Sequence, residues 1–122
     1  MNPAYGFIAG SVILTVYGQL IVKWQVGKLG EFPSETGDRL RYVLDFFANP
    51  WTISAFLLAG VAAICWIAAL SKIELSRAYP FISASFILVL ISSAIFFAEP
   101  ITATKVVGAV LIVTGLIIGS QV

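Results

Sequence analysis

Hydrophobic residues fill four long blocks of this chain, and none of these blocks contains a charged residue. The blocks cover residues 1–22, 46–71, 78–98 and 106–122. A helix needs about 20 mainly apolar residues to cross a bilayer, within a range of roughly 17 to 25, so each block has the length of one crossing. The pattern predicts an all-α membrane protein whose four transmembrane helices cover about 4–24, 50–70, 78–98 and 102–121. We expect a single domain over residues 1–122, with no room for a soluble catalytic domain.

The loop after the first predicted helix holds most of the charge and has a pattern of its own. Its apolar residues follow the i, i+3, i+4, i+7 spacing of one helix face: Leu40, Val43, Leu44 and Phe47. Ser34 is a candidate N-cap for this segment. We expect a short amphipathic helix at about 35–48 that lies on the membrane surface, with a solvated connector as the alternative.

Local signals set the limits of the other helices. Asn49 and Pro50 open the second helix, because asparagine is a favoured N-cap and proline suits the first helical position. The connection over residues 71–77 is so short that the second and third helices are expected to form an antiparallel hairpin. The third helix then starts at residue 78, with Pro80 in its first turn.

Composition narrows the functions open to such a protein. The chain is 60% hydrophobic and 11% charged, with a net charge of +1, so it lacks the basic surface that nucleic acid needs. It contains no histidine and a single cysteine, Cys65, which removes the usual general base and excludes an internal disulfide. The sequence has no catalytic triad, paired carboxylate or phosphate-binding glycine loop. We therefore expect no enzyme activity, no cofactor, no metal and no nucleic-acid partner.

The first predicted helix carries a line of polar residues at intervals of four: Ser11, Thr15, Gln19 and Lys23. This spacing places them on one helix face. Serine and threonine can bond their own helix carbonyls and Lys23 can anchor at the interface, but lipid cannot satisfy the amide of Gln19. No ionisable residue lies deep in any predicted helix, which argues against the membrane carboxylate of a proton-coupled carrier.

Four segments carry a resemblance to a known group of transporters. They are YGQLIVKW at 17–24, ALSKIELSRAYPFIS at 69–83, FFAEP at 96–100 and GAVLIVTG at 108–115. Together they resemble the drug/metabolite transporter superfamily, and the four-helix size is similar to its small multidrug resistance family. The Gly-Gln-Leu-x-x-Lys run and the Ala-Tyr-Pro and Glu-Pro sequences look most like the EamA-like branch that contains the paired subunits of the aminoarabinose-lipid flippase.

The resemblance implies a protein that moves undecaprenyl phosphate carrying a 4-amino sugar across the bacterial inner membrane. Drug exporters of the small multidrug resistance family have an essential glutamate in the first helix, a few residues before a glycine and a lysine. Alignment on Gly18 and Lys23 puts Thr15 at that position, which argues against proton-coupled cation export. The first loop is longer than in the flippase subunits, so another polyprenyl-linked sugar stays open as the substrate.

Candidate contacts for such a lipid headgroup lie near the ends of the predicted helices. Lys23 and Arg77 can hold phosphate, with the role of interfacial anchor as the alternative for each. Gln19, Tyr79 and Ser83 can bond sugar hydroxyls.

Three further residues complete the candidate site. Trp66 offers a surface for packing or for stacking, and Thr15 belongs to the polar line. Glu99 can meet the ammonium of an amino sugar, although we expect it mainly to pair with Lys105 in the turn that follows the third helix.

Four helices that pack against one another fill their own centre, so a headgroup site is expected to require a dimer. The last predicted helix offers a seam of small residues: Gly108, Gly115 and Gly119. We expect a homodimer or a heterodimer with a paralogous subunit. A groove open sideways would leave the prenyl tail among membrane lipids while the lipid-linked sugar crosses.

The distribution of Lys and Arg predicts the orientation. The first and third loops carry five of them against two on the other side, which predicts both termini outside the cytoplasm. Two other functions stay open: a small exporter of cations or metabolites, and a non-transporting membrane partner of a glycolipid-synthesis enzyme.

Overall fold

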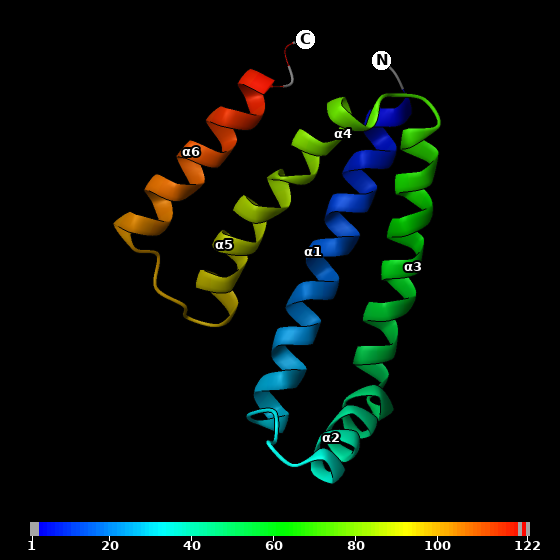
Figure 1. Cartoon of the computed structure of the whole chain (residues 1–122), viewed down its shortest axis with the longest axis vertical. Coiled ribbons are helices and arrows are strands. Elements are labelled where there is room, and N and C mark those ends of the chain that lie inside the picture. Colours follow the sequence, from blue (N-terminus) through cyan, green and yellow to red (C-terminus); the bar gives the residue numbers. More distant parts are fainter. Residues whose placement is uncertain (1–2, 120, 122) are drawn as a thin grey trace.

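The computed structural model describes residues 3–119 and residue 121, and all regular structure in that part of the chain is helical. Six helices follow one another: α1 (Pro3–Leu29), α2 (Thr36–Ala48), α3 (Pro50–Leu70), α4 (Leu75–Ile82), α5 (Ala84–Phe96) and α6 (Ala103–Gly119). α1 lies between α3 and α5, and α6 lies outermost beside α5 (Figure 1). The prediction of an all-helical protein is confirmed.

The helices define two ends of the molecule. The α4 end holds α4, the first turn of α1 and the last turn of α6, whereas the α2 end holds α2 and the last turn of α1 (Figure 1). The rings of Tyr5 and Phe81 are in contact at the α4 end, with their centroids 5.3 Å apart. The rings of Trp24 and Trp51 are in contact at the α2 end, with their centroids 5.7 Å apart.

Three segments are long and apolar enough to cross a membrane: Pro3–Leu29, Pro50–Leu70 and Leu75–Phe97. α6 is also apolar but has 17 residues. α1 extends beyond the predicted limit at residue 24 because it continues to Gly30, which adopts a φ of +87°. Glycine takes this left-handed conformation without strain, so it ends the helix. The 27 residues of α1 span about 40 Å, more than the roughly 30 Å of hydrocarbon in a bilayer.

α2 occupies the predicted segment of the first loop. Its N-cap is Glu35, which makes no side-chain capping bond, so the expectation for Ser34 is wrong. The Tyr42 hydroxyl donates to the carbonyl of Gly30 over 2.7 Å, which ties α2 to the end of α1. Phe47 packs against Phe56 of α3, with ring centroids 5.0 Å apart. The helix has no buried residue among those described.

The third predicted helix differs from the prediction in its start and its continuity. It begins at Leu75 rather than at residue 78, and it breaks at Ser83 into α4 and α5. The earlier start puts Pro80 inside α4 instead of in a first turn. A proline there lacks the N–H that would bond the carbonyl of Ser76, and its ring crowds the preceding turn, so the helix is weakened shortly before the break. α5 runs antiparallel to α3 but packs against α1, without contact to α3.

Small residues bring α1 and α3 together. Ala55, Ala62 and Ala69 of α3 are all buried, and they recur every seven residues. A Cβ on Gly18 would lie 3.6 Å from the carbonyl oxygen of Ala55, and one on Gly10 would lie 3.7 Å from the Sγ of Cys65. Such spacing lets two helix backbones approach closely where no hydrophobic force drives them together. The local signal at Asn49 is also confirmed, because its Oδ1 accepts from the Trp51 amide over 2.8 Å.

Candidate functional site

The polar line of α1 does not form one continuous surface. Ser11 is buried, whereas Thr15 and Gln19 are exposed. Thr15 and Gln19 line a shallow cavity of about 140 Å³ between α1 and α3, opposite Phe56 and other α3 residues. Lys23, one turn further on, reaches away to the loop between α5 and α6.

Lys23 makes the one ion pair found among the described residues. Its Nζ lies 3.8 Å from Oε1 of Glu99. The expected pair between Glu99 and Lys105 is wrong, because the Nζ of Lys105 donates instead to the carbonyl of Pro100 over 2.8 Å. That local bond within the loop satisfies Lys105 and leaves the Glu99 carboxylate free to reach across to α1.

An aromatic groove lies beside this ion pair. It has a volume of about 350 Å³ and is open at its side, and six residues of α1 and the end of α5 line it: Tyr17, Leu20, Ile21, Trp24, Phe96 and Phe97. The Nζ of Lys28 lies 4.0 Å from the centre of the Trp24 ring, a cation–π contact. The Tyr17 hydroxyl lies 3.0 Å from the hydroxyl of Ser54. The α2 end therefore combines charge with aromatic surface.

The other candidate phosphate ligand, Arg77, lies at the α4 end. Together with Lys72 and Glu74 it lines an open cavity of about 500 Å³ at the turn between α3 and α4. Arg77 and Lys72 are exposed, and neither makes an ion pair or a side-chain hydrogen bond within residues 3–119 and 121. These two cations are thus available to an external anion.

Tyr79 and Trp66 also lie at the α4 end. Their ring centroids are 6.3 Å apart in an edge-on arrangement. Trp66 packs against the buried cluster formed by Ile8, Val12 and Val16 of α1 with two alanines, so packing is one role that the structure gives it. The exposed ring of Tyr79 covers part of that tryptophan.

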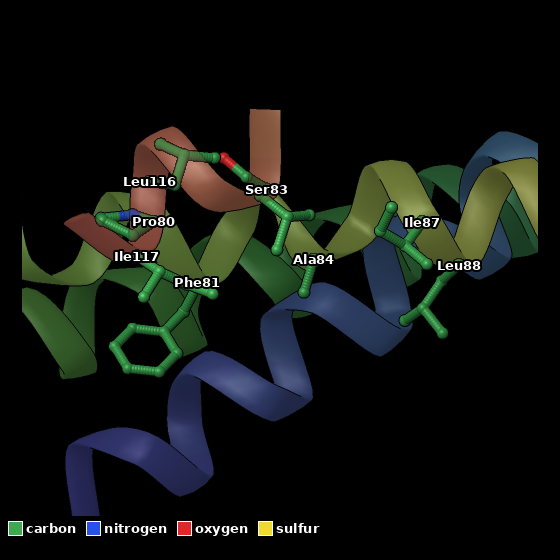
Figure 2. Close-up of a pocket in the computed structure, with 9 residues that line it drawn as sticks. Pro80, Phe81, Ser83, Ala84, Ile87, Leu88, Leu116 and Ile117 are labelled. Atoms are coloured by element: carbon green, nitrogen blue, oxygen red, sulfur yellow. The ribbon is translucent and has the colours of Figure 1, made fainter. Parts of the chain in front are cut away.

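Ser83 lies at the break between α4 and α5, in a cavity of about 440 Å³. Figure 2 shows this cavity, with Pro80, Phe81 and Ala84 on the broken helix and Leu116 and Ile117 on α6. The hydroxyl of Ser83 is the one polar side-chain group among the lining residues. A cavity of this character fits a hydrocarbon chain better than a sugar.

The two candidate phosphate ligands cannot hold the same phosphate. Tyr5, whose ring meets α4, and Lys23 are eighteen residues apart on α1, which corresponds to about 27 Å along the helix. The structure thus brings Lys23 and Glu99 together and keeps Arg77, Tyr79, Trp66 and Ser83 at the opposite end.

Sequence reasoning missed two buried polar residues, Gln25 of α1 and Thr52 of α3. Gln25 is 3% exposed and Thr52 is 0% exposed, and neither the Nε2 of Gln25 nor the Oγ1 of Thr52 has a hydrogen-bond partner in the described part of the chain. A signal for Thr52 exists, because it precedes the buried Ala55 on the small-residue face of α3. Gln25 carries no such signal, since the predicted helix ended before it.

The three glycines of the predicted seam lie on an open helix. A Cβ added to Gly108, Gly115 or Gly119 would meet no atom within 4 Å. Ala109 is the one buried residue that the structure describes in α6. The apolar surface of α6 is therefore uncovered in a single chain.

Known proteins with similar sequences point in one direction. The EamA-like transporter family matches residues 4–120, which confirms the resemblance drawn from the sequence. A protein of Aeromonas salmonicida, named as a probable 4-amino-4-deoxy-L-arabinose-phosphoundecaprenol flippase subunit ArnF, is 31% identical over 93% of this chain and 76% of its own. A protein of Aeromonas hydrophila subsp. hydrophila, named as the probable subunit ArnE, is 31% identical over 87% of both chains.

A further relative matches over a shorter stretch. A Pseudomonas aeruginosa protein named as the probable flippase subunit ArnE is 33% identical over 57% of this chain. The match spans 61% of that relative's own length. No solved structure matches the chain.

Proposed function

Because the chain belongs to the EamA-like transporter family, which contains transporters rather than enzymes, we propose that it moves a polyprenyl-phosphate-linked amino sugar across the bacterial inner membrane. The flippase names of its relatives suggest this substrate class. The observation that carries the proposal is the ion pair of Lys23 with Glu99 beside an aromatic groove. One positive and one negative group within reach of a single headgroup match a sugar lipid that carries a phosphate and an amine.

In this proposal the chain crosses the membrane four times, through α1, α3, the broken helix α4–α5, and α6. The 17 residues of α6 lie at the lower limit of roughly 17 for a crossing. α2 lies on the membrane surface, and its exposed apolar residues Leu40 and Leu44 dip into the interface. The excess of Lys and Arg in the first and third loops faces the α2 end toward the cytoplasm.

The phosphate moves between two cationic ends. Lys23 receives it at the α2 end and Arg77, with Lys72, receives it at the α4 end. The exposed side chains of Gln19 and Thr15 supply hydrogen bonds between them, and Tyr79 and Ser83 do so near the α4 end. The face of Trp66 that Tyr79 leaves open offers a surface on which a sugar ring can stack.

The prenyl tail stays in hydrocarbon throughout. The grooves between the helices are open at the side, so the tail never enters a sealed pore, and the apolar cavity beside Ser83 accommodates part of it. Only the headgroup then needs polar partners within the membrane.

A second copy or a paralogous subunit completes the transporter. Each cavity described above is an open crevice, so the described residues of one chain do not enclose a headgroup. The relatives carry two different subunit names, ArnE and ArnF, which favours a heterodimer, and α6 supplies the uncovered face with Gly108, Gly115 and Gly119.

If the α6 glycines form the dimer contact, a large residue in their place should weaken the dimer without unfolding the chain. Gly115→Leu is expected to weaken the dimer by at least about tenfold, because a large side chain keeps two helices from close approach. The fold of each chain stays intact, since nothing lies within 4 Å of a Cβ at that position. Gly60→Leu on α3 is the matched control, because its Cβ also meets nothing within 4 Å. Loss of the dimer in both variants, or in neither, would contradict the seam; cross-linking in bilayers measures it.

Transbilayer movement tests the function. The purified chain, alone and with a paralogous subunit, is reconstituted into liposomes that contain a polyprenyl-phosphate 4-amino-4-deoxypentose. A membrane-impermeant amine reagent then reports how much of the lipid reaches the outer leaflet. Labelling is expected to exceed the outer-leaflet share of protein-free liposomes, and Gln19→Ala is expected to slow it. No movement with either preparation would refute the proposal, and movement of a soluble cation instead would identify an exporter.

A further inference from the structure

The ion pair of Lys23 and Glu99 joins the two segments of the chain that line the aromatic groove. Lys23 directly precedes the groove residue Trp24, and Glu99 follows the groove residue Phe97 by two positions. The two charges come from elements 76 residues apart in sequence, α1 and the α5–α6 loop. A ligand that occupies the groove from the membrane therefore meets both charges at its polar end.

This ion pair is weak and can be broken at small cost in free energy. The Nζ–Oε1 distance of 3.8 Å is close to the 4.0 Å limit for such a pair, and the two side chains are 60% and 40% exposed. Exposed pairs of this kind contribute little to stability because water and salt screen them. A charged ligand that offers better geometry can replace either partner at small cost.

Among the described residues, Glu99 forms an ion pair with Lys23 alone. Lys105, the other base of that loop, is held by the Pro100 carbonyl. The backbone also fixes the position of Glu99, because its amide donates to the carbonyl of Ser93 over 3.3 Å and Ala98 before it has a φ of +54°. A non-glycine residue in that left-handed region holds the chain in a turn at a cost in strain. The backbone at Glu99 is therefore held in place, and its carboxylate is directed toward Lys23 of α1.

We infer that an amino-sugar phosphate replaces the Lys23–Glu99 ion pair charge for charge, which makes Glu99 the residue that selects lipid headgroups carrying an amine. This inference rests on the proposed function and names the specificity of that site. The phosphate diester carries one negative charge and binds Lys23, while the ammonium of the sugar binds Glu99. Every charge then keeps a partner, and the net charge of the occupied site equals that of the empty one.

A lipid with the same phosphate but a hydroxyl in place of the amine cannot make this exchange. Its phosphate would bind Lys23, and the Glu99 carboxylate would then lie unpaired beside a second anion, the phosphate. An interaction that leaves a charge unpaired and sets like charges together excludes the wrong ligand as effectively as new contacts favour the right one. We expect discrimination of about tenfold between the two lipids, the ratio that corresponds to roughly 1.4 kcal/mol.

Equilibrium binding tests the exchange. The full chain in nanodiscs is titrated with polyprenyl-phosphate 4-amino-4-deoxypentose and with the matching hydroxy lipid. The wild type is expected to prefer the amino lipid about tenfold. Glu99→Gln is expected to lose that preference, with weaker binding of the amino lipid and stronger binding of the hydroxy lipid, and Glu99→Asp to retain most of it.

Glu31→Gln is the matched control, because Glu31 is an exposed acid of the loop between α1 and α2 that makes no ion pair with the described residues. It should keep the preference. A preference that survives in Glu99→Gln, or an equal affinity of the wild type for both lipids, would overturn the inference and leave the proposed function standing. If the wild type binds neither lipid, the proposed function fails and the inference fails with it. Retained helical content shows that Glu99→Gln is folded.

Discussion

The two ends of the helix bundle carry the same kind of charge but use it differently. At the α2 end, Lys23 is paired with Glu99 and Lys28 lies over the ring of Trp24. At the α4 end, Lys72 and Arg77 line an open cavity and pair with nothing that the structure describes. At the α2 end the lysine already has an acidic partner, whereas at the α4 end the two cations form no ion pair with the described residues. This difference favours selection between lipids at the α2 end and binding of any phosphate at the α4 end.

Removal of the lysine is the strongest way to break this comparison. Lys23→Gln is expected to reduce both binding and transport of the amino lipid by at least about tenfold, since a charge-assisted bond to phosphate contributes roughly 1.5–3 kcal/mol. The variant also leaves Glu99 without its cation, so the carboxylate repels the phosphate. Lipid titration in nanodiscs and liposome labelling measure the two effects.

Lys105→Gln is the control for that variant. Lys105 lies in the same loop as Glu99 but bonds the Pro100 carbonyl instead, so its loss removes an equal charge without touching the ion pair. Lipid binding should change less than twofold. If the two variants weaken binding equally, general attraction by positive charge explains the result and the Lys23 site does not.

Arg77 should separate transport from binding. Arg77→Gln is expected to slow lipid movement by roughly fivefold, because Lys72 in the same cavity compensates for part of the lost charge-assisted bond. Affinity measured at the α2 end should stay unchanged, since the α4 end and the α2 end are opposite ends of the bundle (Figure 1). Arg41→Gln on exposed α2 is the matched control. An equal loss of binding and transport in Arg77→Gln would mean that the ends do not act separately.

The smallest expected effect is on stability. A double-mutant cycle of Lys23→Gln and Glu99→Gln should give a coupling of only about 0.2–1 kcal/mol in thermal unfolding. The exposure of both side chains places the value toward the low end of that range. A coupling of several kcal/mol would show that the ion pair stabilises the fold strongly, and a lipid headgroup could not replace it easily.

The sequence predicted the helices better than their details. Charge-free blocks locate apolar helices because each crossing must exclude charge, and the Asn49–Pro50 start of α3 follows from local chemistry alone. The break at Ser83 was not predicted, because proline is tolerated in the first turn of a helix and disrupts only its interior. Whether Pro80 lies in a first turn depends on where its helix begins. That start, at Leu75, lies within a charged turn and has no clear signal of its own.

The site depends on tertiary contacts that spacing does not reveal. The sequence suggested Lys105 as the partner of Glu99 because the two are close along the chain. The actual partner, Lys23, comes from a helix that packs against α5, and only the fold brings it there. The regular line from Ser11 to Lys23 was a real feature of the helix face, but α3 and α5 divide that face between a buried contact, a shallow cavity and an ion pair.

The distance between Lys23 and Glu99 in a lipid bilayer tests the central claim most directly. Solid-state NMR on the full chain, labelled at the lysine Nζ and the glutamate carboxyl, can follow this distance with and without lipid. The account predicts a pair near the 3.8 Å nitrogen–oxygen separation of the structure in plain bilayers, and loss of the direct contact once the amino-sugar lipid is added. An ion pair that stays closed in bilayers where the lipid is bound and moved would contradict it.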